Sequence, residues 1–101
     1  MRYTEVMHVI TRKRLLEFAK QHSNTSKSLD AWYRIIKSTD IFNFSELKNI
    51  FPSVDKVGNL TVFNIGGNKI RLIAAIHYNS QNLYIRHVLT HKKYDEEKWK
   101  V

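Results

Sequence analysis

From Asn59 onward, apolar and polar residues alternate with a period of two, and this pattern constrains the fold more than any other feature of the sequence. It predicts β-strands at Leu60–Ile65, Lys69–Tyr78 and Asn82–Thr90. The turns between them are short and contain Gly and Asn, which tolerate a positive φ angle. Connections this short join antiparallel neighbours. The second half of the chain is therefore predicted to form an antiparallel sheet.

The first half of the chain is predicted to be mainly helical. Residues 6–11 are short and β-branched, and they predict one initial strand. Apolar residues then recur at helical spacing and predict helices over residues 12–22 and 25–38. A third, short helix is expected to begin after Asn43, because Glu46 follows three residues later as in a capping box.

Two threonines are expected to cap helices through their hydroxyl groups. Thr11 precedes the helix over residues 12–22, and Thr90 precedes a short helix from His91 to about Trp99. Together these elements predict an α+β fold, in which a small antiparallel β-sheet packs against N-terminal helices and a short helix follows the last strand. At this length we expect a single domain over residues 1–101.

The side chains of the two longer predicted strands divide between two faces of the sheet. One face is almost purely apolar and comprises Ile70, Leu72, Ala74 and Ile76 on the first strand and Leu83, Ile85, His87 and Leu89 on the second. The opposite face carries Arg71 and Arg86. The simplest packing places the helices against the apolar face. The other face would then be basic and partly open to solvent.

The charge of the chain narrows the class of partner. It has 17 Lys and Arg residues against 9 Asp and Glu residues, a formal net charge of +8. Such a charge favours a polyanionic partner, either nucleic acid or an acidic protein. The chain has no cysteine, which excludes disulfides and thiolate metal sites. It also lacks a convergent set of metal ligands and a long apolar run, so we expect no metal, no cofactor, no membrane segment and a cytoplasmic location.

Two groups of residues are candidates for chemistry. Arg71 and Arg86 suit bidentate contact with phosphate, although arginines on a sheet also pair with carboxylates or cover its surface. On the C-terminal helix, His91, Tyr94 and Asp95 would lie one turn apart. A histidine beside a carboxylate can transfer protons near neutral pH. The alternative is an ordinary capped helix with a solvated face.

Further basic residues lie close to the predicted open face. Positively charged groups can hold the phosphates of a nucleic acid. The candidates for binding RNA or another polyanion are Lys56, Lys69, His77, Lys92 and Lys93.

Five segments of the chain are distinctive as motifs: Met7–Thr11, Asp30–Tyr33, Phe51–Val57, Val62–Leu72 and Tyr84–Asp95. The run V-F-N-I-G-G-N-K-x-R-L and the later T-H-x-x-Y-D are the most specific. Together they resemble the HigB-type toxins of bacterial type II toxin–antitoxin systems, within the RelE-like superfamily. The resemblance covers about residues 7–100, so Met1–Val6 is expected to be an N-terminal extension.

The resemblance implies a RelE-like fold and an endonuclease that cuts mRNA, usually on the ribosome, without a cofactor. It also implies a helix-turn-helix antitoxin of the HigA type, through which alone the protein would reach operon DNA. By motif, the catalytic role falls on Arg71, Arg86, His91 and Tyr94. Better-studied members place two lysines on the strand before the central one, where this chain has Phe63-Asn64-Ile65.

Two other functions are compatible with the same residues. A non-catalytic RNA- or ribosome-binding module would use the basic sheet without needing His91 or Tyr94. A plain interaction protein would use the basic face only to hold an acidic antitoxin. Salt dependence would not separate these two alternatives, because both would bind through charge.

Overall fold

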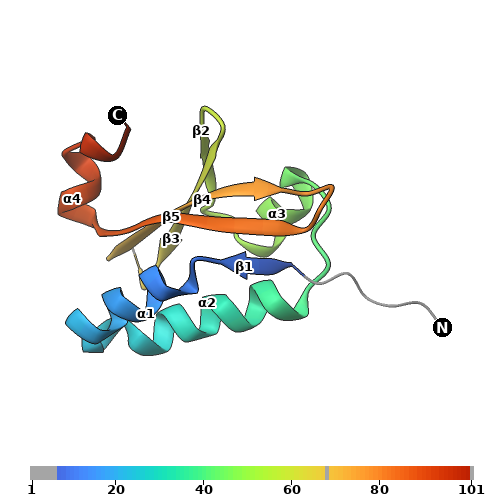
Figure 1. The fold of residues 1–101 in the computed structure, drawn as a ribbon. Coiled ribbons are helices and arrows are strands. Elements are labelled where there is room, and N and C mark those ends of the chain that lie inside the picture. Colours follow the sequence, from blue (N-terminus) through green and yellow to red (C-terminus); the bar gives the residue numbers. More distant parts are fainter. Residues whose placement is uncertain (1–6, 68, 101) are drawn as a thin grey trace.

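The computed structural model describes residues 7–67 and 69–100, and it confirms the predicted α+β fold. Met1–Val6, the expected extension, lies outside the described residues. In chain order the elements are β1 (His8–Ile10), α1 (Arg12–Gln21), the 3₁₀ helix η1 (Ser23–Thr25), α2 (Ser26–Ser38), α3 (Phe44–Ile50), β2 (Asp55–Val57), β3 (Leu60–Ile65), β4 (Ile70–His77), β5 (Asn82–Thr90), α4 (His91–Asp95) and the 3₁₀ helix η2 (Lys98–Lys100). The strands form one sheet in the order β1-β5-β4-β3-β2 (Figure 1).

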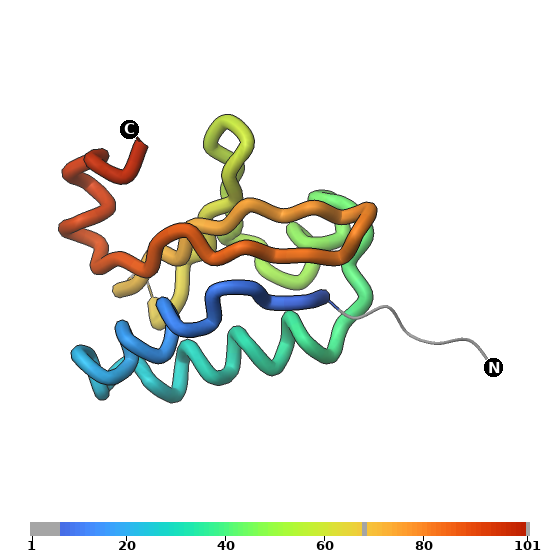
Figure 2. The backbone as a smooth tube through the Cα atoms, viewed as in Figure 1, coloured from blue at the N-terminus to red at the C-terminus, as the bar shows by residue number. Residues whose placement is uncertain are grey.

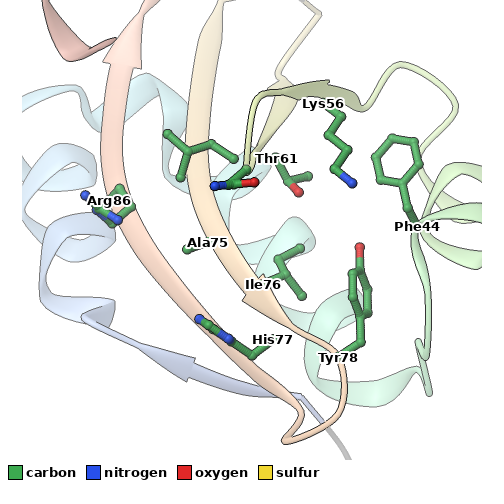
Figure 3. Close-up of a pocket in the computed structure, with 10 residues that line it drawn as sticks. Phe44, Lys56, Thr61, Ala75, Ile76, His77, Tyr78 and Arg86 are labelled. Carbon is green, nitrogen blue, oxygen red and sulfur yellow. The ribbon is translucent and has the colours of Figure 1, made fainter. Parts of the chain in front are cut away.

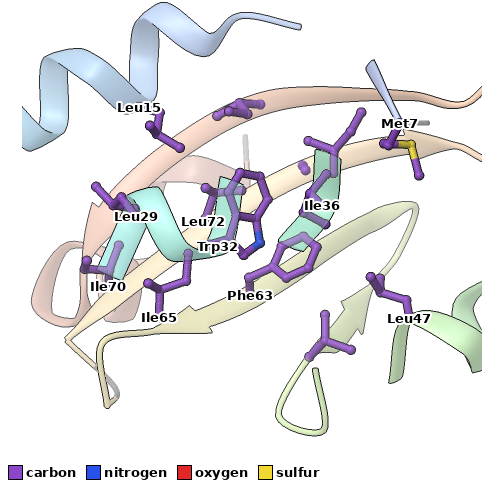
Figure 4. Packing of buried hydrophobic residues seen from close by; sticks show 14 of the residues in the cluster. Met7, Leu15, Leu29, Trp32, Ile36, Leu47, Phe63, Ile65, Ile70 and Leu72 are labelled. Carbon is purple, nitrogen blue, oxygen red and sulfur yellow. The ribbon is translucent and has the colours of Figure 1, made fainter. Parts of the chain in front are cut away.

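The main hydrophobic core lies between the sheet and the helices α1, α2 and α3. Leu29 and Ile36 of α2 are fully buried in it. The Trp32 ring packs edge-on against Phe63 of β3, with 5.2 Å between ring centroids (Figure 4). Rings in this orientation add to the stability gained from buried area. The apolar stripe that predicted α2 is therefore the surface that covers the sheet.

Three consecutive strands are antiparallel, as predicted: β3 pairs with β4, and β4 with β5. Two pairings were not predicted. The short β2 pairs with β3, and the resulting hairpin rises away from the β4–β5 hairpin (Figure 2). At the other edge, β1 runs parallel to β5, with His8 opposite Asn82. The sheet therefore joins the early part of the chain to its last strand.

The predicted caps have different outcomes. The Asn43 side chain accepts a hydrogen bond from the Glu46 amide at 2.8 Å, and the Thr90 hydroxyl accepts one from the Lys93 amide at 3.2 Å. Both caps are confirmed. The prediction for Thr11 was wrong: this residue precedes α1 but has a left-handed backbone, with φ of 69°, and makes no side-chain cap. A capping residue ordinarily has an extended backbone, which places its side-chain oxygen on the first free amides of the helix, and Thr11 lacks that backbone conformation.

A β-bulge in β5 overturns part of the predicted division of faces. Ile73 of β4 lies opposite His87, whereas the next residue, Ala74, lies opposite Ile85. Arg86 is therefore an extra residue without a partner in the ladder. An extra residue reverses the alternation of side chains beyond it. His87 consequently leaves the apolar face to which the simple alternation assigned it.

Beyond the bulge, Val88 packs against the main core, although an unbroken alternation through Arg86 would place it on the opposite face. Leu89, predicted for the core, packs instead in a second cluster on the opposite face. That cluster is built on Val62, Ile73 and Trp99. The C-terminal helix is shorter than predicted: α4 ends at Asp95, and the chain turns back so that Trp99, 9% exposed, covers the sheet. The predicted open face is therefore covered in its centre.

Within residues 7–67 and 69–100, the helices are too short and too polar to cross a lipid bilayer.

Candidate functional site

Arg71 and Tyr94 meet where the C-terminal segment lies against the sheet. The Arg71 guanidinium carbon is 5.5 Å from the centre of the Tyr94 ring, within the range of a cation–π contact. Tyr94 stacks on Trp99, with 5.1 Å between ring centroids, and the Trp99 indole N–H donates a hydrogen bond to the Tyr94 carbonyl. The second cluster therefore fixes Tyr94, and Tyr94 positions Arg71 beside the exposed surface.

His91 is held at the start of α4. Its Nδ1 atom lies 2.9 Å from a carboxylate oxygen of Asp95, one helical turn later. A neutral imidazole in this geometry carries its proton on Nδ1, so its Nε2 atom is the proton acceptor. The His91 amide also donates a hydrogen bond to the carbonyl of Lys69, two residues before Arg71. This bond ties the start of α4 to the start of β4.

Three of the four predicted catalytic residues, Arg71, His91 and Tyr94, therefore lie at one end of the sheet. We call these three residues the α4 site. Exposed lysines surround this site, and they comprise three of the five predicted RNA-binding residues: Lys69, Lys92 and Lys93. The arrangement places a guanidinium, an imidazole and an aromatic ring at one end of the sheet, among exposed lysines.

The structure does not bring Arg86 to the α4 site. Arg71 lies opposite Leu89, and Arg86 is three residues away on β5, roughly 10 Å along the strand. The second cluster lies between the two arginines. Arg86 instead lines a cavity of about 440 Å³ together with the other two predicted RNA-binding residues, Lys56 and His77 (Figure 3). The predicted basic residues therefore form two separate groups.

His87 lies beside α1, a position that the simple alternation along β5 did not predict. With Arg14 and Glu17 of α1 it lines a cavity of about 260 Å³. Burial lowers the pKa of the His87 imidazole below its ordinary value, and repulsion by Arg14 and Arg86 lowers it further. The only signal in the sequence was a polar residue on an otherwise apolar strand face, directly after Arg86.

Acidification is expected to destabilise the protein through His87. The pKa of His87 in the folded protein lies below the ordinary value of 6.5. As the pH falls through 6.5, the unfolded chain therefore binds a proton at His87 before the folded protein does, which favours unfolding. The contribution to stability is complete above the ordinary pKa and is lost as the pH approaches the folded-state pKa. We expect His87→Gln to lose less stability than the wild type between about pH 7.5 and about pH 5 in urea unfolding. Equal losses would contradict this, and His8→Gln, at an exposed position in β1, is the control.

Among the residues that the structure describes, no three histidine or acidic side chains are gathered so that they could hold an ion.

Comparisons with known proteins agree with the resemblance seen in the sequence. The profile of the HigB_toxin family, described as the RelE-like toxic component of a toxin–antitoxin system, matches residues 25–97. The chain is 39% identical over 92 residues to the mRNA interferase toxin HigB of Escherichia coli strain K12, covering 88% of each chain. It is 31% identical over 93 residues to the mRNA interferase HigB of E. coli O6:H1 strain CFT073, covering 89% of this chain and 90% of that protein.

Proposed function

Because this chain belongs to the HigB family of RelE-like toxins, we propose that it is an endoribonuclease that cuts mRNA on the ribosome and so inhibits translation. The observation that carries the proposal is the α4 site. In this site the guanidinium carbon of Arg71 lies 5.5 Å from the centre of the Tyr94 ring, and His91 lies at the start of the same short helix as Tyr94. A cation and an oriented imidazole are two groups that RNA cleavage requires.

RNA supplies its own nucleophile, the 2′-hydroxyl group, so this step needs no metal ion. The enzyme must remove the 2′ proton, stabilise charge on the phosphate as the new P–O bond forms, and protonate the departing 5′ oxygen. His91 is suited to a proton transfer through Nε2, because Asp95 holds its Nδ1. Arg71 is suited to stabilise the phosphate because a guanidinium does not lose its charge. Tyr94 orients Arg71 and offers a face on which a base can stack.

Arg86 is proposed to act in RNA binding beside the reacting phosphate. We assign it this role because it lies three residues along β5 from Leu89, the residue opposite Arg71, and because it lines a cavity together with Lys56 and His77. Exposed lysines around α4 would hold the neighbouring phosphates, as expected for a chain with a net charge of +8. These lysines are Lys69, Lys92 and Lys93.

A toxin of a toxin–antitoxin system has an antitoxin as its partner. We propose that this antitoxin is a HigA-type helix-turn-helix protein, and that the toxin reaches operon DNA only through it. The other proposed partners are the ribosome and its message, which places the protein in the cytoplasm.

The experiment that tests the function is induction of the protein in a bacterial host, followed by primer extension on an abundant message. We expect growth arrest together with new 5′ ends within the message. Growth arrest without cuts would contradict cleavage and favour a non-catalytic module that blocks translation. Neither arrest nor cuts would contradict the toxin function itself.

A further inference from the structure

A second site is formed where the edge of β4 is left without a neighbouring strand. The pairing of β3 with β4 ends at Thr61 and Ala74, whereas β4 continues to His77. The β2–β3 hairpin turns away at this point, and the cavity of about 440 Å³ lies in the gap. This volume is within the usual range of sites for small ligands. We call this cavity the β4-edge pocket.

The chemistry of the β4-edge pocket combines cations with aromatic rings. Figure 3 shows Lys56, Phe44 and Tyr78 on one side of the pocket and Arg86 on the other, with Ala75 between them. Among the residues that the structure describes, those that line the pocket include no aspartate or glutamate. Cations that face a pocket without carboxylates favour an anionic ligand, and the rings favour one with a flat apolar part.

Tyr78 also lines this pocket, and its hydroxyl points toward Lys56 (Figure 3). This oxygen is buried, and no hydrogen-bond partner for it is found among the described residues. Burial also raises the pKa of the Tyr78 phenol, so the group keeps its proton and stays a donor. A buried hydroxyl without a partner destabilises a protein, and an acceptor atom on a bound ligand would satisfy it.

We propose that the β4-edge pocket binds one nucleotide of the RNA strand, with its base against Phe44 and Tyr78 and its phosphate between Lys56 and Arg86. The proposal rests on the proposed function and names a binding site for its substrate. Because the second cluster separates this pocket from the α4 site, the bound nucleotide is a neighbour of the one whose phosphate is cut. The pocket would thus select the sequence beside the cut.

A peptide strand is the competing occupant, because an exposed strand edge can also pair with a partner protein. We favour the nucleotide because one such ligand carries both a flat base and a phosphate, and so matches Phe44, Lys56 and Arg86 at once, whereas a peptide would need a separate side chain for each.

The test uses nucleoside 3′,5′-bisphosphates as probes, titrated into the full-length protein and followed by NMR. These probes contain no internucleotide bond, so their binding does not depend on cleavage. Phe44→Leu should weaken binding by about 5- to 100-fold, the usual cost of losing one stacked base. Tyr78→Phe retains the ring and should weaken binding by about 3- to 10-fold.

Phe42→Leu is the matched control, because Phe42 is an exposed phenylalanine immediately before the cap of α3. It should bind the probes as the wild type does. Wild-type binding by both pocket variants would overturn the proposal, as would probe-induced shifts confined to α4. Failure of the proposed function would show differently, as a protein that makes no cuts in message whether or not the probes bind. A third outcome would assign the pocket to a peptide strand and overturn the proposal. In that outcome the antitoxin displaces the probes, and the pocket variants bind RNA with the affinity of the wild type.

Discussion

Replacement of His91 by Gln is expected to reduce mRNA cleavage by a factor of about 10²–10⁴, the usual contribution of a general acid or base. Glutamine is polar and similar in length, but it cannot take up or release a proton at neutral pH. The fold should survive, because the His91 side chain is 51% exposed and its contact with Asp95 lies on the surface of α4. Cleavage is measured by primer extension after induction, and toxicity by the growth rate.

The control for this prediction is His8→Gln, which removes an exposed histidine from β1 at the far edge of the sheet. It should cut as the wild type does. Thermal unfolding of both purified variants would show whether loss of activity reflects loss of fold. If a folded His91→Gln protein cleaved message at the wild-type rate, His91 would have no part in the proton transfers.

Replacement of Arg71 by Ala should lower cleavage by about 10²–10³, the usual cost of removing one preorganised group that stabilises transition-state charge. Two effects combine here: the charge is lost from the phosphate, and Tyr94 loses its contact with the guanidinium. Arg71→Lys separates them, because lysine retains the charge but not the planar group. We expect Arg71→Lys to cut more than Arg71→Ala and less than the wild type, measured by the same primer extension.

Arg34→Ala provides the matched control, because Arg34 is an exposed arginine of α2 that pairs with Asp30 on the helical surface. An exposed ion pair contributes little to stability. Its loss should leave cleavage and growth arrest unchanged. Equal cleavage by folded Arg71→Ala and Arg34→Ala proteins would remove Arg71 from the α4 site.

Most elements of the fold could be predicted from the sequence, because their signals are local. The stripe that includes Leu29 and Trp32 predicted α2, and the pair Gly66-Gly67, both with positive φ, predicted the turn before β4. The bulge at Arg86 could not be predicted, since a shift of one residue leaves no mark on a short alternating pattern. The pairing of β1 with β5 was also missed, because it joins residues far apart in the chain.

The candidate site could be predicted only in part, because some of its residues are close in the sequence and others are brought together by the whole sheet. His91 and Tyr94 are one helical turn apart, so their proximity follows from local sequence. Arg71 comes close to them because β4 pairs with β5, the predicted neighbouring strand that leads into α4. Phe44 and Tyr78 carry no motif. Both line the β4-edge pocket, which lies where β4 continues beyond its pairing with β3, and that is a property of the whole sheet and not of any one segment.

The parallel pairing of β1 with β5 also has a consequence for when the protein becomes active. His8 and Asn82 can pair only after the chain between them has been synthesised and its long loop has closed, which carries an entropy cost. Contacts of such long sequence separation form slowly. During translation the sheet therefore stays incomplete until β5 has left the ribosome, and the α4 site follows later still. The proposed α4 site is thus incomplete in a nascent chain until β5 and α4 have both emerged.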